Sequence, residues 1–336
     1  MAPDVSVIIP VYNVEKWLRE CLDSVCGQSL RNIEIVCIND GSPDHSLEIM
    51  KEYAARDDRF LIIDKQNEGV GAARNDGIRA AHGEFVAFMD PDDKYPDSDT
   101  LRLLYDAAKE HDVLAAGGYF GCIDENSMPV PKSRSYYGVD FSCAGLTQYQ
   151  GFQCDYQFQA YVFQREFLIR NKLFFPMYSR FQDPPFFVRT MTAMGSFYAV
   201  DRMTYLYRPG IMKSKFKFQK AFDLMCGITD NLILSKEKEF ARLHFISAMR
   251  LLTDASLMVK SMPDDERFYD LVWKYIKTAG MIDEGLIRDA GYELPKPVLP
   301  ALFTQMIDES KKYRALRKHK SVRAIEKLIS LSSFFM

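Results

Sequence analysis

Short apolar runs alternate with helical patterns along the first 120 residues of the chain. Each run is bounded by polar or turn residues and contains no proline, as expected of a buried strand. The five runs are Val5–Ile9, Ile33–Ile38, Phe60–Ile63, Phe85–Met89 and Val113–Ala116. They recur roughly every 25–30 residues, a spacing typical of strand–helix–strand units. The pattern therefore predicts an α/β fold with a mainly parallel sheet that helices cover on both faces.

Four helices are predicted between these strands. Apolar residues follow the i, i+3, i+4, i+7 spacing between Val14 and Val25, and Asn13 is the expected N-cap. The second helix is expected to begin at Ser42–Pro43, because serine caps a helix and proline suits its first turn. The third and fourth are expected over Val70–Ala81 and Thr100–His111. Ligands bind beyond the carboxyl ends of the strands in such folds, so the residues after each strand are site candidates.

The pattern changes after the fifth strand. The middle of the chain is rich in Phe and Tyr, contains turn clusters and gives only short strand or helix signals. We interpret it as an elaboration at the sheet edge that could receive a second substrate. From Phe218 onward the pattern is helical, as in Leu232–Val259 and Phe268–Thr278, until Pro295–Pro300 interrupts it like a linker.

These patterns predict that the chain is divided into two parts. The expected divisions are one domain over 1–215, with halves at 1–120 and 121–215, and a mainly helical region over 216–336. The tail at 311–336 is basic, with eight Lys or Arg against one Glu between Lys311 and Lys327. It suits an amphipathic helix on the anionic inner face of the plasma membrane. An equally good interpretation of this tail is a charged helix that packs on the domain or on another subunit of a homo-oligomer.

Composition narrows the class of protein. Of 336 residues, 47% are hydrophobic and 26% are charged, and a net charge of −3 argues against a nucleic-acid partner. The seven cysteines include no C-x-x-C pair, which argues against a zinc site and favours a reducing compartment. No apolar run approaches the ~18 residues of a membrane span, and the first residues resemble no signal peptide. We therefore expect a cytoplasmic protein.

Polar residues follow four consecutive strands. Tyr12 comes after the first strand, where it could stack on a nucleobase or be an ordinary aromatic at a strand end. Asp40 comes after the second, where it could accept a hydrogen bond from a base N–H or be a turn residue. After the fourth strand, Asp90, Asp92 and Asp93 lie within four residues. Clustered carboxylates repel one another unless a cation compensates them, and oxygen ligands suit Mg²⁺ or Mn²⁺. An acidic turn that caps the next helix is the alternative reading.

Two common nucleotide motifs are not matched. Gly69-Val70-Gly71 would need a third glycine where Arg74 stands, and it follows the third strand rather than the first. No G-x-x-x-x-G-K-[ST] phosphate loop occurs in the sequence.

Five motifs in order resemble family 2 glycosyltransferases. They are Val5-Ser6-Val7-Ile8-Ile9-Pro10-Val11-Tyr12-Asn13, Asn39-Asp40-Gly41-Ser42-Pro43-Asp44, Gln66-Asn67-Glu68-Gly69, Ala73-Arg74-Asn75 and Asp90-Pro91-Asp92-Asp93. The likeness continues more loosely through Arg165-Glu166-Phe167-Leu168, Asp183–Phe187 and Tyr205-Leu206-Tyr207-Arg208, and covers about residues 3–215. The resemblance implies a GT-A (Rossmann-like) nucleotide-diphospho-sugar transferase domain of the inverting type that builds bacterial surface polysaccharides.

The resemblance also implies roles for individual residues. Tyr12 and Asp40 would hold the nucleobase, usually uracil, and Asp92 would ligate a Mn²⁺ or Mg²⁺ ion. The other residues implied on the donor side are Pro10, Asn13, Glu15 and Asn67 around the nucleoside, Arg74 near the phosphates or sugar, and Asp90 near the ribose and metal.

Asp183 matches the family's catalytic base. The family normally has Glu before this residue, whereas this chain has Gln182, so the charge beside the base differs. Asp183-Pro184 also looks like a helix start with Asp183 as N-cap. On the acceptor side the candidates are Tyr161, Gln182 and Arg208. The segment with Tyr161 departs from the family's usual basic or Trp-containing pattern, and its ring belongs either to an aromatic acceptor platform or to the core. Arg208 could reach an anionic acceptor or the diphosphate, or lie on the solvated surface.

The sequence thus predicts metal-dependent, inverting transfer of a sugar, most often from a UDP-sugar. The acceptor would be a hydroxyl of a saccharide or of a lipid-linked glycan. One alternative is a sugar nucleotidyltransferase, which would need a Gly-rich loop after the first strand, where Pro10-Val11-Tyr12-Asn13 stands instead. Another is an inactive transferase-like binding subunit, against which the retained acidic residues argue.

Overall fold

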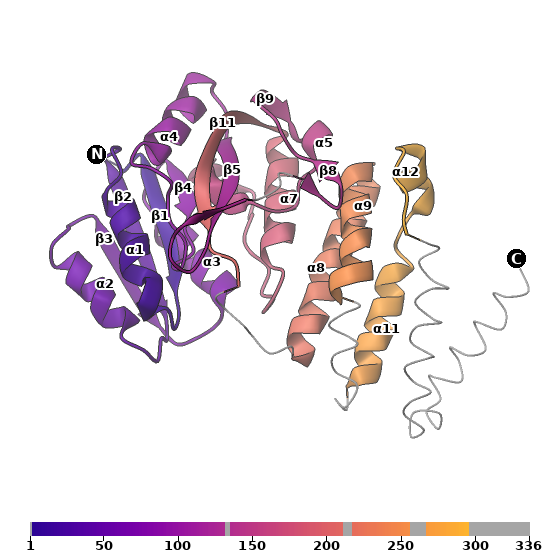
Figure 1. Ribbon diagram of the computed structural model, residues 1–336, viewed down its shortest axis with the longest axis horizontal. Helices are drawn as coiled ribbons and strands as arrows, with labels where there is room; N and C mark the ends of the chain where they lie inside the picture. Colours follow the sequence, from indigo (N-terminus) through magenta and orange to yellow (C-terminus); the bar gives the residue numbers. More distant parts are fainter. Residues whose placement is uncertain (1, 132–134, 211–216, 256–266, 296–336) are drawn as a thin grey trace, which may run out of the picture. The chain divides into compact units, whose positions relative to one another are not determined.

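The computed structural model describes residues 2–131, 135–210, 217–255 and 267–295 (Figure 1). Contacts between residues divide the chain into two compact units, Met1–Lys215 and Phe216–Met336. The predicted basic tail, and all but the first residue of the predicted linker, lie outside the described residues.

Strands and helices alternate through the first part of the first unit. They are β1 (Val5–Val11), α1 (Glu15–Cys26), β2 (Ile33–Asp40), α2 (Ser46–Ala54), β3 (Phe60–Lys65), α3 (Val70–Ala80), β4 (Phe85–Phe88), α4 (Thr100–Glu110) and β5 (Ala115–Ile123). All seven residues of β1 and all four of β4 are buried, which is why these strands are almost entirely apolar. The predicted alternation is confirmed.

The second part of this unit holds shorter elements and two long ones. They are β6 (Pro129–Val130), β7 (Ser135–Tyr136), β8 (Val139–Asp140), β9 (Gly145–Gln148), α5 (Tyr149–Phe152), the 3₁₀ turn η1 (Phe158–Ala160), β10 (Tyr161–Gln164), α6 (Arg165–Arg170), α7 (Asp183–Met194) and β11 (Ser196–Tyr207). The expectation of only short elements was wrong for α7 and β11. β11 exposes Asp201-Arg202-Met203 at its centre, where its pairing with β5 shifts register, and this hides the strand in the sequence.

One sheet runs through the first unit in the order β3-β2-β1-β4-β10-β5-β11-β9 (Figure 1). The pairs β3–β2, β2–β1, β1–β4 and β5–β11 are parallel. β10 is antiparallel to both β4 and β5, and Val162 pairs with Ala87 on one side and Ala116 on the other. The mainly parallel sheet is confirmed, and the antiparallel insertion of β10 is an added finding. The carboxyl ends of β1 to β4 therefore share one edge.

Two helix starts differ from the prediction. Asn13 has φ +52° and the N-cap of α1 is Val14, so the predicted cap is wrong. α2 begins at Ser46 rather than at Ser42–Pro43. The cause is an exchange of hydrogen bonds between the two helix starts. Asp44 accepts from the backbone N–H of Glu15 at 2.8 Å, and Glu15 accepts from that of His45 at 2.8 Å.

The second unit is helical where it is described, as predicted. Its elements are α8 (Phe218–Glu237), α9 (Ala241–Arg250), a π-helical turn (Leu251–Ala255), α11 (Phe268–Ala279) and α12 (Glu284–Asp289). The prediction of one helix from Leu232 to Val259 was wrong, because the chain turns at Glu239 with φ +57°. None of the helices in the described ranges has the length and apolar character needed to cross a bilayer.

A buried histidine connects three elements of this unit. Nδ1 of His244 on α9 lies 2.8 Å from Oγ of Ser235 on α8. Its Nε2 accepts from the backbone N–H of Asp283, the N-cap of α12, at 2.8 Å. Nδ1 must therefore carry the proton of a neutral ring. Burial lowers the pKa of His244 to about 4, which favours that neutral form.

Candidate active site

The acidic turn after β4 is held by partners from distant segments. The carboxylate of Asp90 accepts from Nη2 of Arg74 at 2.6 Å and from Nε2 of Gln159 at 2.9 Å. The buried Asp93 accepts from the Tyr205 hydroxyl at 2.8 Å and from a backbone N–H at 2.7 Å. The same Tyr205 oxygen accepts from the backbone N–H of Asp90 at 3.0 Å. Two of the three carboxylates are thus bound by the protein itself.

Charge accumulates at this turn. Burial, and then the charge of Asp90, raise the pKa of Asp92 to about 6. Burial and the two neighbouring carboxylates raise the pKa of Asp93 well above its usual range. Burial is the larger cause of both shifts, and the neighbouring carboxylates add to it.

The donor set of the turn fits a divalent cation that binds mainly through a ligand. Among the described residues, no group of three or more His, Cys, Asp or Glu is arranged to hold a metal. Mg²⁺ and similar ions, however, are usually bound by one or two carboxylates together with substrate phosphates. With Asp90 and Asp93 engaged by protein donors, the Asp92 carboxylate is the candidate ligand.

Arg74 on α3 supplies the cation beside this turn. It is 4% exposed, and its guanidinium carbon lies 4.9 Å and 5.2 Å from the ring centroids of Phe158 and Phe175. Its Nε and Nη1 are buried and have no hydrogen-bond partner in the described structure. A buried donor without a partner costs about 1–3 kcal/mol. A bound anion that reached these nitrogens would remove that cost, so Arg74 is a candidate for binding a phosphorylated ligand.

The residues predicted to hold the nucleobase lie at the same sheet edge. Tyr12 follows β1 and is 43% exposed, so one part of its ring is open to a ligand. Asp40 ends β2, and its two oxygens accept from the backbone N–H groups of Glu68 and Gly69 at 2.9 and 2.8 Å. Each carboxylate oxygen can accept a further bond. Asp40 therefore orders the loop after β3 and keeps the capacity to bind a base N–H.

The other predicted nucleoside contacts differ in exposure. Pro10 is buried within β1, whereas Asn13 and Asn67 are exposed at the strand ends. A Cβ on Gly41, which has φ +69°, would lie 3.0 Å from the backbone nitrogen of Asn67. Only glycine fits this close approach. Glu15 is exposed and one of its carboxylate oxygens accepts from the backbone N–H of His45 at the start of α2, so its place in the nucleoside pocket stays a prediction.

Asp183 is the first residue of α7, and the N-cap is Gln182. The alternative in which Asp183 is the N-cap is therefore wrong. Its helix is fixed to the donor side through aromatic rings, because Phe186 stacks on Phe175 with centroids 3.8 Å apart. Phe175 in turn faces Arg74. A carboxylate in the first turn of a helix is stabilised by the helix dipole.

Two features of α3 tie the segment before α7 to the donor side. The Asn75 side chain donates to the carbonyl of Phe175 at 2.9 Å and accepts from its N–H at 2.8 Å. A Cβ on Gly71 would lie 3.1 Å from the carbonyl of Pro176 and 3.5 Å from Cγ of the buried Gln182. Asn75 was missed as a site residue, although it belongs to the Ala73-Arg74-Asn75 motif.

Arg208 lies beneath the acidic turn and not on an acceptor surface. Its Nε donates to the Asp92 carbonyl at 2.9 Å, Nη1 to the Asp124 carbonyl at 2.6 Å, and Nη2 to Glu20 at 2.7 Å. Its guanidinium carbon lies 4.3 Å from the Trp17 ring centroid. The expectation of an acceptor contact is corrected, because the buried guanidinium is used to hold the turn.

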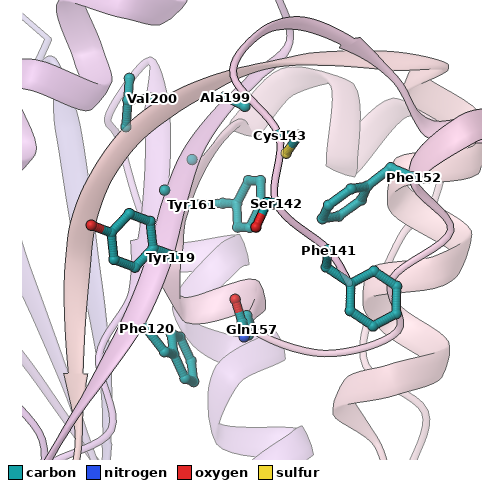
Figure 2. A pocket seen from close by; sticks show the side chains of 12 residues that line it. Tyr119, Phe120, Phe141, Ser142, Cys143, Phe152, Gln157, Tyr161, Ala199 and Val200 are labelled. Atoms are coloured by element: carbon teal, nitrogen blue, oxygen red, sulfur yellow. The ribbon is translucent and has the colours of Figure 1, made fainter. Parts of the chain in front are cut away.

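Tyr161 takes part in an aromatic hollow next to this site (Figure 2). Its ring is buried against Phe163, Phe187 and Phe197, with centroids 6.0, 5.2 and 5.4 Å away. The residues that line the hollow are Gly117, Gly118, Tyr119, Phe120, Phe141, Ser142, Cys143, Phe152, Gln157, Tyr161, Ala199 and Val200.

The fold and the site define an α/β protein with an acidic turn and a buried arginine at the carboxyl ends of its parallel strands. The model of glycosyl transferase family 2 matches residues 6–202, more than half of the sequence. The chain belongs to this family.

Individual proteins that resemble this chain include glycosyltransferases. EpsJ of Bacillus subtilis, an uncharacterised glycosyltransferase, is 34% identical over 215 residues, which is 62% of this chain and 62% of EpsJ. The Staphylococcus aureus TarS 1–349 structure with UDP-GlcNAc has a TM-score of 0.68 and 19% identity, over 84% of this chain and 82% of that one. A Pyrobaculum calidifontis mannosyltransferase with GDP-Man and Mn²⁺ has a TM-score of 0.53 and 17% identity, over 99% and 88%. At 19% and 17% identity, the likeness to these two structures establishes the fold of this chain.

Proposed function

We propose that this protein transfers a sugar from a nucleotide sugar, with UDP as the nucleotide, to an acceptor hydroxyl with inversion of configuration. The buried Arg74, with two nitrogens that lack a partner in the described structure, is the observation that carries the proposal. It lies beside the acidic turn, at the sheet edge that also carries Tyr12 and Asp40. The UDP-GlcNAc complex of TarS, which shares the fold, supports a UDP-sugar donor.

In this proposal the donor lies along the strand ends. The Tyr12 ring stacks on the uracil, and Asp40 accepts its N–H. The spare N–H groups of Arg74 bind the diphosphate and stabilise the charge that develops as it leaves. A divalent metal bound through Asp92 would supply further stabilisation of that charge, and the Mn²⁺ complex of the mannosyltransferase supports this assignment.

Asp183 is the proposed general base. Its carboxylate takes the proton of the acceptor hydroxyl while the hydroxyl oxygen attacks the anomeric carbon. The bond from that carbon to the diphosphate oxygen breaks, and its electron pair leaves with the UDP. The first turn of α7 favours the ionised carboxylate that this step requires. The acceptor would be a saccharide or a lipid-linked glycan of a surface polysaccharide.

The test measures release of nucleoside diphosphate from a panel of sugar nucleotides with Mn²⁺, with Mg²⁺ and with chelator. We expect one UDP-sugar to be cleaved, cleavage to stop with chelator, and Asp92→Asn to abolish it. Glu110→Gln is the matched control, since this exposed carboxylate at the end of α4 should leave the rate unchanged. If no donor is bound or cleaved with either metal, the proposal is refuted in favour of a binding subunit.

Inversion and the base are tested separately. The anomeric proton coupling of the product gives its configuration. Asp183→Asn should lower kcat by at least ~10²-fold while the Kd for UDP stays within about twofold. A variant that keeps its rate would exclude Asp183 as the base.

A further inference from the structure

The second half of β11 contains a β-bulge. Met203 pairs with Tyr119 of β5, and Tyr205 pairs with the next residue of β5, Phe120, so Thr204 is an extra residue between them. A bulge bends its strand and changes the direction of the side chains around it, often beside an active site. Tyr205 follows this bulge directly and is fully buried, and its ring stacks on that of Phe120 with centroids 4.8 Å apart.

A glycine of the neighbouring strand permits this path of β11. A Cβ on Gly118 of β5 would lie 2.3 Å from the carbonyl oxygen of Arg202, just before the bulge. That distance is far below van der Waals contact, and the atom in the way belongs to the backbone. Any larger residue at position 118 would therefore displace β11 where the bulge begins.

The Tyr205 hydroxyl joins the two ends of the acidic turn. Its oxygen accepts from the backbone N–H of Asp90 at 3.0 Å, and its proton is donated to the Asp93 carboxylate at 2.8 Å. Within the turn itself, the N–H of Asp93 donates to the carbonyl of Asp90 at 3.0 Å. One buried hydroxyl from a distant strand therefore fixes the spacing between the first and the last aspartate of the turn.

The end of β11 holds the rest of the turn. The other oxygen of the Asp93 carboxylate accepts from the backbone N–H of Arg208 at 2.7 Å, and Nε of Arg208 donates to the carbonyl of Asp92 at 2.9 Å. Lys94 and Leu206 exchange two backbone hydrogen bonds, at 3.0 and 3.3 Å. Asp92 lies between these contacts, so the backbone that carries its carboxylate is fixed on both sides.

A metal bound through one carboxylate and a diphosphate depends on the position of that carboxylate. Groups that orient a metal ligand from behind often matter as much as 10–100-fold in metal affinity. We propose that Tyr205 is a positioning residue for the metal, because its hydroxyl sets the shape of the acidic turn and thereby the place of the Asp92 carboxylate. The inference rests on the proposed function, in which Asp92 binds the metal. It assigns Asp93 to the support of that ligand.

Tyr205→Phe tests this role, since it removes the hydroxyl and keeps the ring that stacks on Phe120. Calorimetric titration of the full chain with UDP in chelator measures donor affinity without metal. Electron paramagnetic resonance of free Mn²⁺ then gives the Mn²⁺ Kd of the UDP-saturated protein. We expect this Mn²⁺ Kd to rise about ten- to hundredfold in the variant, while the Kd for UDP in chelator stays within about twofold.

Tyr149→Phe is the matched control. Tyr149 is a buried tyrosine of the same unit, and its hydroxyl donates to the Cys154 carbonyl at 2.8 Å. It comes directly after β9, the strand at the far edge of the sheet from β3. Urea unfolding should show a loss of stability in both variants, because each loses a buried hydrogen bond. Only Tyr205→Phe should lose Mn²⁺ affinity.

The outcomes separate this inference from the proposed function. If Tyr205→Phe binds Mn²⁺ as tightly as the wild type, if its UDP affinity in chelator falls by the same factor, or if Tyr149→Phe loses as much Mn²⁺ affinity, Tyr205 does not position the metal ligand. A wild-type chain that binds UDP but no Mn²⁺ would instead refute the metal assignment in the proposed function, and this inference with it. A wild-type chain that does not bind UDP under either condition would refute the proposed donor.

Discussion

The Arg74→Met variant tests whether the buried guanidinium contributes to ligand binding or to the stability of the fold. Arg74 donates one hydrogen bond to Asp90 and keeps two buried nitrogens without a partner in the described structure. Loss of a bond to a charged group costs about 1.5–3 kcal/mol, whereas each buried donor without a partner already costs about 1–3 kcal/mol. The two effects oppose each other. We therefore expect the free energy of unfolding to fall by less than about 2 kcal/mol.

Donor affinity should fall much more. One charge-assisted contact to the diphosphate contributes about 2 kcal/mol, so its loss raises the Kd for UDP about 30-fold. Binding also stabilises the fold, by about 2.7 kcal/mol when the ligand is at 100 times its Kd. After a 30-fold loss of affinity, the same UDP concentration would stabilise the variant by only about 0.9 kcal/mol.

Calorimetric titration with UDP, and urea unfolding with and without UDP, measure both quantities. Arg59→Met is the matched control. Arg59 is ion-paired to Asp57 at 2.6 Å, has a buried nitrogen without a partner in the described structure, and lies just before β3, at the opposite edge of the sheet. It should change stability and leave the Kd for UDP unaltered. If Arg74→Met binds UDP as tightly as the wild type, its spare nitrogens do not bind the diphosphate.

Three further predictions concern other described contacts. The pKa of His244 is about 4 in the folded protein and 6.5 in the unfolded chain, so the unfolded chain binds a proton first as the pH falls. The free energy of unfolding should therefore decrease by about 3 kcal/mol in all between pH 6.5 and pH 4. Urea unfolding across this range should show the loss, and the exposed His45→Gln variant should show it too. Asn75→Asp removes the donor to the Phe175 carbonyl, so kcat should fall about ten- to hundredfold while the Kd for UDP stays unchanged. Steady-state kinetics and calorimetric titration measure the two quantities. An equal loss of turnover and of UDP affinity would contradict a positioning role for Asn75. Arg208→Met should lower the free energy of unfolding by about 3–5 kcal/mol in urea titrations, because the buried guanidinium gives up three charge-assisted bonds, to the Asp92 and Asp124 carbonyls and to the Glu20 carboxylate; an unchanged midpoint would oppose this.

The sheet could be predicted because its central strands are buried on both faces. β1 and β2 are almost entirely buried and mostly apolar, so the local sequence is enough to identify them as strands. The position of the acidic turn follows from the same reasoning, since Asp90 and Asp92 come just after a buried strand. The roles of these residues stay predictions, although the structure gathers Tyr12, Asp40 and Arg74 at the expected edge.

What could not be predicted depends on contacts between distant segments. Arg208 looks like a surface residue in the sequence, because a buried guanidinium needs partners that only the fold assembles, here Asp92, Asp124 and Glu20. The start of α2 was misplaced for a similar reason. Its first turn exchanges hydrogen bonds with Glu15 of another helix, and no local capping rule contains that information.

The position of β10 has a consequence for how the chain folds during synthesis. β4 ends at Phe88, but the strand that covers its second edge begins only at Tyr161. At 5–20 residues per second, the ribosome needs roughly 4–15 s to make the intervening segment. Throughout that interval the nascent chain presents an apolar strand edge to its surroundings. A fragment cut after β5 would keep this edge permanently, so it should aggregate even though it carries the residues proposed for nucleotide binding.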